Sequence, residues 1–132
     1  MAEGFAQDWL KKNDYRGWLA ASAGTLASNG ISTSNETKDA LAQRGIAFSG
    51  TSTSLTGKMV HAAHIVLCMS TTHMDTARQL AGDDTTIELL DPAGTIPDPA
   101  GQDQVVYDAL ADRLENLIAQ RLELIIQKAG NS

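Results

Sequence analysis

Two short apolar runs constrain the fold of this chain more than any other feature. The first spans residues 64–69 and reads HIVLCM, a continuous run typical of a strand that is covered on both faces. The second spans residues 86–90 and ends in IELL. A segment with helical character at 71–81 and a Gly-Asp-Asp turn at 82–84 lie between them. A strand, a helix and a second strand in this order predict a βαβ unit and therefore a parallel sheet.

The remaining segments add helices and one more strand to this unit. Apolar spacing and capping residues predict helices at 1–13, from Ser32 or Ser34 to 43, from Ser54 or Thr56 to 63, and at 102–128. Gly45 is the expected stop of the second helix, and no capping side chain precedes the first. A further strand is expected at 18–23. Strands alternating with helices predict a doubly wound, three-layer α/β/α fold in a single domain, residues 1–132.

Composition excludes several classes of partner. The chain has 132 residues and a net charge of −6, and its ten Lys and Arg residues are scattered, which disfavours nucleic acid and anionic membranes as partners. The single cysteine excludes an internal disulfide and fits a reducing compartment. The first residues, MAEGFAQDWLKK, contain no signal-peptide core, and no apolar run reaches the length of a membrane span. We therefore expect a cytoplasmic protein.

Asp98 is the candidate catalytic residue. It precedes Pro99 in a proline-rich loop that follows the 86–90 strand, and open α/β sheets carry their chemistry in loops beyond the carboxyl ends of strands. The competing interpretation is a turn aspartate that caps the next helix. Asp91, which also precedes a proline, comes directly after the strand, and we interpret it as a turn residue.

Neither the thiol nor the histidines predict a site of their own. Cys68 lies inside an apolar strand without an arginine or a glycine-rich loop at a suitable spacing, and is interpreted as a buried core residue. His61, His64 and His73 together with Cys68 lack a second thiolate or a carboxylate cluster for tetrahedral zinc. We expect no metal and no cofactor.

Several motifs, in order, resemble those of the low-molecular-weight protein tyrosine phosphatase family, which includes arginine phosphatases and arsenate reductases. They are SAGT at 22–25, GI at 45–46, VLCM at 66–69, IELL at 87–90, DPAG at 98–101 and Tyr107. The resemblance implies a flavodoxin-like sheet of four parallel strands. In this family a catalytic C-x5-R loop follows the first strand and precedes residues like Met1-Ala2-Glu3. The expectation is therefore a truncated chain whose first, central strand and catalytic loop lie upstream of Met1.

The resemblance also implies the chemistry. A cysteine thiolate attacks phosphorus, backbone N–H groups and an arginine hold the phosphate, and Asp98 protonates the leaving oxygen. The implied substrate is a phosphorylated protein or a small phosphomonoester. Ser22 would belong to a hydrogen-bond network that braces the catalytic loop; Gly50 and Thr53 stand where the family often has histidine and arginine. Ala100 replaces an aromatic residue that lines the substrate site in tyrosine phosphatases. Without its nucleophile, the chain as given is expected to be inactive.

Two alternatives remain open at this point. The chain could be a catalytically silent, phosphatase-like module that binds a partner or a phosphorylated ligand. An unrelated flavodoxin-like receiver domain is less consistent, since the acidic cluster and phosphoacceptor aspartate of such domains are missing. Leu124 and Ile126 widen the apolar stripe of the last helix and could serve a homodimer contact.

Overall fold

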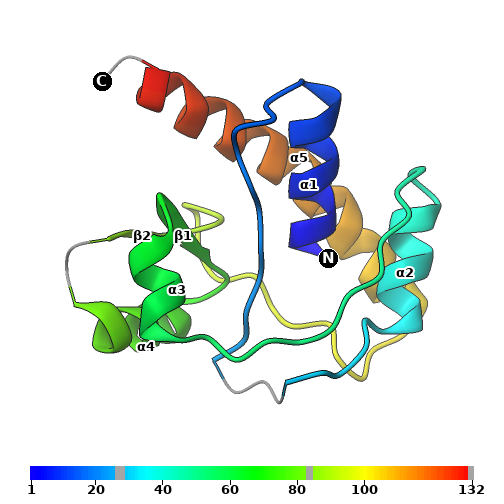
Figure 1. Cartoon of the computed structure of the whole chain (residues 1–132). Coiled ribbons are helices and arrows are strands. Elements are labelled where there is room, and N and C mark those ends of the chain that lie inside the picture. The colour runs from blue at the N-terminus through cyan, green and yellow to red at the C-terminus, as the bar shows by residue number, and fades with distance from the viewer. Residues whose placement is uncertain (26–28, 83–84, 131–132) are drawn as a thin grey trace. The chain divides into compact units, whose positions relative to one another are not determined.

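The computed structural model describes residues 1–25, 29–82 and 85–130, and these form two compact units. The helical unit consists of Met1–Ser22, Ser32–Thr51 and Pro99–Ser132. The sheet unit consists of Ala23–Ile31 and Ser52–Asp98. The helices and strands of both units are labelled in Figure 1. None of the helices in the described ranges has an apolar stretch that could span a bilayer.

The sheet unit is built on the predicted βαβ motif. Strand β1 (Ile65–Cys68) pairs in parallel with β2 (Thr86–Leu89), in a register that sets Ile65 opposite Thr86 and Cys68 opposite Leu89. Helix α4 (Thr71–Ala81) connects the two strands and packs against both of them, and α3 (Gly57–Ala62) packs against α4 (Figure 1). The prediction of an α/β fold with a parallel sheet is confirmed.

A small aliphatic core holds this unit together. Its buried members come from α3, both strands and α4, with partly buried residues packed around them: Val60, Cys68, Ala77 and Ile87, then Leu55, Val66 and Met74. Gly57 brings α3 very close to α4, because a Cβ built on it would lie 2.6 Å from the carbonyl oxygen of Leu80. The first three residues of β1 are only partly buried, so the expectation of a strand covered on both faces is wrong for them.

Side-chain caps fix where three of the helices begin. The hydroxyl of Thr56 accepts a hydrogen bond from the Met59 N–H at the start of α3, and Ser70 does the same for α4. Ser34 caps α2 (Asn35–Ala42), and the turn that follows this helix contains Gly45, which has a φ of +75°. Ser34 and Thr56 are among the caps expected from the sequence, and Gly45 is the expected stop.

The helical unit is organised around one long helix. Helix α5 (Gln104–Gly130) packs against both α1 (Ala2–Lys12) and α2 (Figure 1). Its buried positions recur at helical spacing: Tyr107, Ala111, Leu114, Ile118 and Ile125. Val106, although apolar, is 41% exposed, and the buried face of α5 begins at Tyr107.

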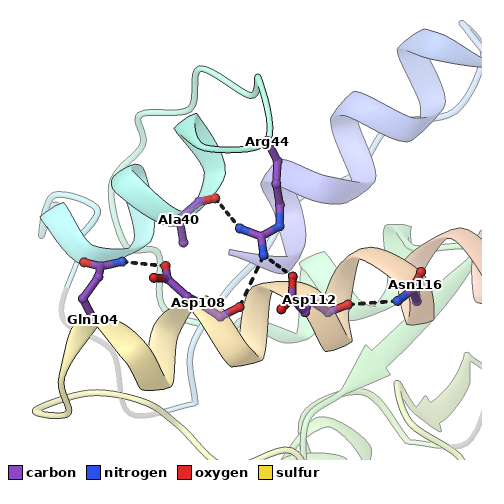
Figure 2. Close-up of polar contacts among 6 residues, drawn as sticks. All are labelled: Ala40, Arg44, Gln104, Asp108, Asp112 and Asn116. Carbon is purple, nitrogen blue, oxygen red and sulfur yellow. Dashed lines mark hydrogen bonds and ion pairs between the residues drawn. The ribbon is translucent and has the colours of Figure 1, made fainter.

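A polar lock joins α2 to α5 (Figure 2). Arg44, just beyond α2, donates to the carbonyl oxygens of Ala40 (2.8 Å) and Asp108 (3.4 Å), and forms an ion pair with Asp112. Gln104 donates to the Glu36 carbonyl oxygen at 3.0 Å and to the Asp108 carboxylate at 2.9 Å. These contacts connect α2 and the residue Arg44 beyond it to the first part of α5, although the two helices lie far apart in the sequence.

The prediction of a strand at 18–23 is wrong. The backbone of this segment bonds to side chains of α1, because Gln7 donates to the Ala20 carbonyl oxygen and the Ser22 N–H donates to Glu3. Leu19 is 94% exposed, whereas a sheet strand would cover it. In the described part of the chain the sheet has two strands, and Gly24 makes a single bridge to Ser54.

Candidate functional site

The loop after β2 is fixed at the carboxyl end of the parallel strands. The Leu90 N–H donates to the Cys68 carbonyl oxygen at 2.8 Å, which continues the strand pairing by one residue. Further along, the Ile96 N–H donates to the Met69 carbonyl oxygen, also at 2.8 Å. Ile96 is only 4% exposed. The loop therefore returns to the end of β1 before it leaves the sheet unit.

Asp98 follows this anchor by two residues and is exposed, whereas Ile96 is buried. It is the last residue of the sheet unit. Its carboxylate therefore lies in a loop beyond the carboxyl ends of two parallel strands, the edge at which open α/β sheets bind and transform ligands. Asp91 has the role expected of it, since its carboxylate accepts a hydrogen bond from the Ala93 N–H at 2.9 Å in a local turn.

The residues after Asp98 form a tight turn at the start of the next segment of the helical unit. The Gln102 N–H donates to the Pro99 carbonyl oxygen at 2.9 Å, and Gly101 has a φ of +80°, a conformation that glycine adopts without strain. Ala100 is exposed in this turn. Its methyl group offers a substrate little of the apolar contact that an aromatic ring would provide.

Ser22, another predicted site residue, contacts the first turn of α1. Glu3 accepts two hydrogen bonds on Oε1, from the Ser22 N–H at 2.7 Å and from the Ser22 hydroxyl at 2.8 Å. Gln7 donates to the other carboxylate oxygen at 3.2 Å. As predicted, α1 begins without a side-chain cap. The structure thus joins Ser22 to Glu3, a residue whose role the sequence reasoning missed.

A signal for Glu3 was present in the sequence. A carboxylate in the first turn of a helix that lacks a capping side chain interacts favourably with the positive end of the helix dipole. Its pairing with Ser22, 19 residues away, depends on the tertiary structure. Gly50 and Thr53, which stand where the family often has histidine and arginine, make local contacts. The Gly50 N–H donates to the Thr33 hydroxyl at 3.1 Å. The Thr53 carbonyl oxygen accepts a hydrogen bond from the Gly24 N–H at 2.9 Å.

Cys68 is a core residue. The side chain is 6% exposed and packs with Val60, Ala77 and Ile87. Burial raises the pKa of the Cys68 thiol, and the positive charge of Arg78 only partly opposes this shift. A protonated, enclosed thiol is a poor nucleophile. In the described residues no three His, Cys, Asp or Glu side chains are placed to hold a metal ion.

Comparison with known protein families gives a match over nearly the whole chain. Residues 1–130 match the family model described as low molecular weight phosphotyrosine protein phosphatase. A search of curated proteins found no significant match.

Solved structures agree with the family match. A low molecular weight protein tyrosine phosphatase from T. tengcongensis is 28% identical, with a TM-score of 0.85, covering 92% of this chain and 87% of that one. The YwlE arginine phosphatase from Geobacillus stearothermophilus is 28% identical, with a TM-score of 0.79 and coverages of 93% and 86%. A low molecular weight protein tyrosine phosphatase from Bacillus subtilis is 25% identical, with a TM-score of 0.82 and coverages of 96% and 87%.

Proposed function

Because the chain belongs to the low molecular weight phosphotyrosine protein phosphatase family, we propose that it is a phosphomonoester hydrolase domain with Asp98 as its general acid. The fold is the flavodoxin-like α/β fold of these phosphatases. The family match across residues 1–130 supports treating the chain as one domain.

The hydrogen bond between Ile96 and Met69 is the observation that carries this proposal. It fixes the loop to the end of β1 two residues before Asp98, so the carboxylate is held by the sheet rather than by a freely moving connection. A general acid must be positioned within hydrogen-bond reach of the oxygen that it protonates. The exposed position of Asp98 beside the buried Ile96 supports such a role, because the loop is held while the carboxylate stays at the surface.

The proposed reaction has two steps. A thiolate attacks phosphorus and the bond from phosphorus to the leaving group breaks (P–O in a phosphomonoester, P–N in phosphoarginine), while Asp98 transfers its proton to the departing oxygen or nitrogen. Water then hydrolyses the phosphocysteine, with the Asp98 carboxylate accepting a proton from that water. Cys68, the single cysteine of the chain, is buried and does not fit the role of nucleophile. We assign this role to a C-x5-R loop that would precede α1.

The proposed substrates are phosphorylated proteins or small phosphomonoesters. The proposed compartment is the cytoplasm. One similar protein is named a tyrosine phosphatase and another an arginine phosphatase, so both phosphorylated residues are candidates. The methyl group of Ala100 supports a substrate that does not depend on stacking against an aromatic ring.

Two polypeptides test the proposal with p-nitrophenyl phosphate. The 132-residue chain is expected to show negligible turnover, and a version carrying a family-type strand and C-x5-R-S-P loop in front of Met1 is expected to hydrolyse the ester. In the extended version Asp98→Asn should lower kcat by a factor of about 10²–10⁴. Asp91→Asn is the matched control and should leave kcat unchanged.

Two results would contradict the assignment. One is turnover by the 132-residue chain that Asp98→Asn abolishes, since a nucleophile would then lie among these residues. The other is an active extended protein that is indifferent to Asp98→Asn, which would remove the acid role while keeping the phosphatase assignment.

A catalytically silent module is the second candidate, and the buried state of the single thiol favours it. This candidate predicts binding of phosphotyrosine or phosphoarginine by the 132-residue chain without release of phosphate. Titration calorimetry together with a phosphate-release assay separates the two candidates, because the first requires turnover once the loop is supplied.

A further inference from the structure

An apolar groove lies beside α1 in the helical unit. Its volume is about 350 Å³. Its lining residues come from the second half of α1 and from the segment 15–20 that returns along it: Gln7, Leu10, Lys11, Tyr15, Arg16, Trp18, Leu19 and Ala20. Leu10 is 6% exposed, whereas Leu19 is 94% exposed. The groove thus includes both a covered and an open leucine.

The groove is formed before any ligand arrives, because segment 15–22 is tied to α1 at both ends. At one end the Tyr15 N–H donates to the Leu10 carbonyl oxygen at 2.9 Å, and the Tyr15 ring stacks on Trp9 with centroids 5.6 Å apart. At the other end Gln7 holds Ala20 through its carbonyl oxygen. A ligand would not have to order this segment, so binding avoids that entropic cost.

The charge of the groove is opposite to that of the whole chain. The chain carries a net charge of −6, yet the described residues that line the groove include two cations, Lys11 and Arg16, and no carboxylate. Arg16 is paired with Asp14 at 2.6 Å. Lys11 is exposed, and no ion pair involves it among the described residues. An acidic ligand therefore has a complementary partner at this position.

We propose that this groove binds an extended segment of a partner protein in which one large apolar side chain is flanked by carboxylates. The apolar side chain would cover Leu19 and Tyr15, and a flanking carboxylate would pair with Lys11. An exposed leucine next to an aromatic ring in a pre-formed groove provides the apolar anchor that peptide recognition uses. The proposal does not depend on catalysis, because binding is measured without turnover.

A factorial set of short fluorescent peptides tests the proposal on the 132-residue chain. The central residue is leucine, phenylalanine, tryptophan or serine, and both flanks are glutamate, glutamine or lysine. Fluorescence anisotropy should give the tightest binding for an apolar centre with glutamate flanks. Leu19→Ser should weaken that binding about tenfold or more. Lys11→Glu should reverse the preference from glutamate to lysine flanks.

Two control variants isolate the groove. Leu124→Ser removes another exposed leucine, on α5, and Lys128→Glu reverses another exposed lysine; both should leave the affinity unchanged. Peptide binding that is absent, that survives Leu19→Ser, or that is tightest with lysine flanks in the unmodified chain would overturn the proposal. Self-association lost in Leu19→Ser without peptide binding would assign the groove to a second copy instead, and would likewise overturn it.

Discussion

Ser22 and Glu3 are joined by two hydrogen bonds that end on the same carboxylate oxygen. The Ser22 N–H and hydroxyl donate to Glu3 Oε1 at 2.7 and 2.8 Å, across 19 residues of sequence. Hydrogen bonds to a charged acceptor are stronger than those between neutral groups. This contact fixes Ser22 to the first turn of α1, and it replaces the strand pairing that the sequence led us to expect there.

Removing the charge of Glu3 should weaken this contact. Glu3→Gln keeps an acceptor oxygen but loses both the charge and its interaction with the helix dipole, so the free energy of unfolding should fall by about 1 kcal/mol. Glu3→Ala, which removes both acceptors, should cost about 1–3 kcal/mol. Glu115→Gln, at an exposed position on α5, is the control and should have almost no effect in urea unfolding. Equal losses in Glu3→Gln and Glu115→Gln would refute the role of Glu3.

The lock between α2 and α5 should depend on Arg44 much more than on its ion-pair partner. The Arg44 side chain is 16% exposed and donates hydrogen bonds to two backbone carbonyl groups. It also forms an ion pair with Asp112, whose side chain is 75% exposed. Arg44→Ala should lower the free energy of unfolding by about 1–3 kcal/mol, whereas Asp112→Ala should cost at most about 1 kcal/mol, because exposed ion pairs contribute little. Thermal melts of both variants measure the difference. A larger loss in Asp112→Ala would show that the ion pair dominates.

The close approach of α3 and α4 should make Gly57 intolerant of substitution. In Gly57→Ala the new methyl group would lie 2.6 Å from the Leu80 carbonyl oxygen, so the two helices must separate. The expected loss in free energy of unfolding is about 1–3 kcal/mol, although alanine is the better helix former. Gly17→Ala is the control, since a methyl group there meets nothing within 4 Å, and its stability should be unchanged or slightly raised. Equal stability of the two variants would contradict the packing of α3 on α4.

Cys68 should make the stability of the protein fall at alkaline pH. Burial raises the pKa of its thiol in the folded state, so the folded state retains a proton that the unfolded chain releases above about pH 8.5. The stability from this residue is complete below that pH and is lost as the pH rises through the folded pKa. Cys68→Ala should cost about 1 kcal/mol at neutral pH, and the difference from the unmodified protein should shrink between about pH 8 and pH 10. A difference that grows over this range would reverse the sign of the pKa shift.

The sequence predicted elements whose signals are local. Ser34 and Thr56 cap the helices that they were expected to cap, and the apolar runs at 64–69 and 86–90 contain the two paired strands. The prediction of a strand at 18–23 failed because the apolar composition of this segment resembles that of a strand, whereas its backbone bonds to side chains of α1. Whether a peptide group bonds to a strand or to a glutamate is decided by tertiary contacts.

The candidate site was predictable to a similar extent. The Asp-Pro pair indicated an acid in a loop after a strand, and the structure has that loop at the expected edge of the sheet. The anchor at Ile96 was not predictable, since a hydrogen bond between two backbone groups leaves no mark on residue type. The lock at Arg44 was missed for another reason: its partner Asp112 is 68 residues away.

The tie between Ile96 and Met69 has an evolutionary consequence. Both of its atoms belong to the main chain, so mutation of Met69, or of Ile96 to any residue except proline, changes the side chain without deleting the donor or the acceptor. Neighbouring positions such as Pro97 and Ala100 can therefore change in identity while Asp98 keeps its place. With Asp98 as the proposed proton donor, a lineage, or a protein engineer, can vary the side chains around it without rebuilding the backbone that holds the loop.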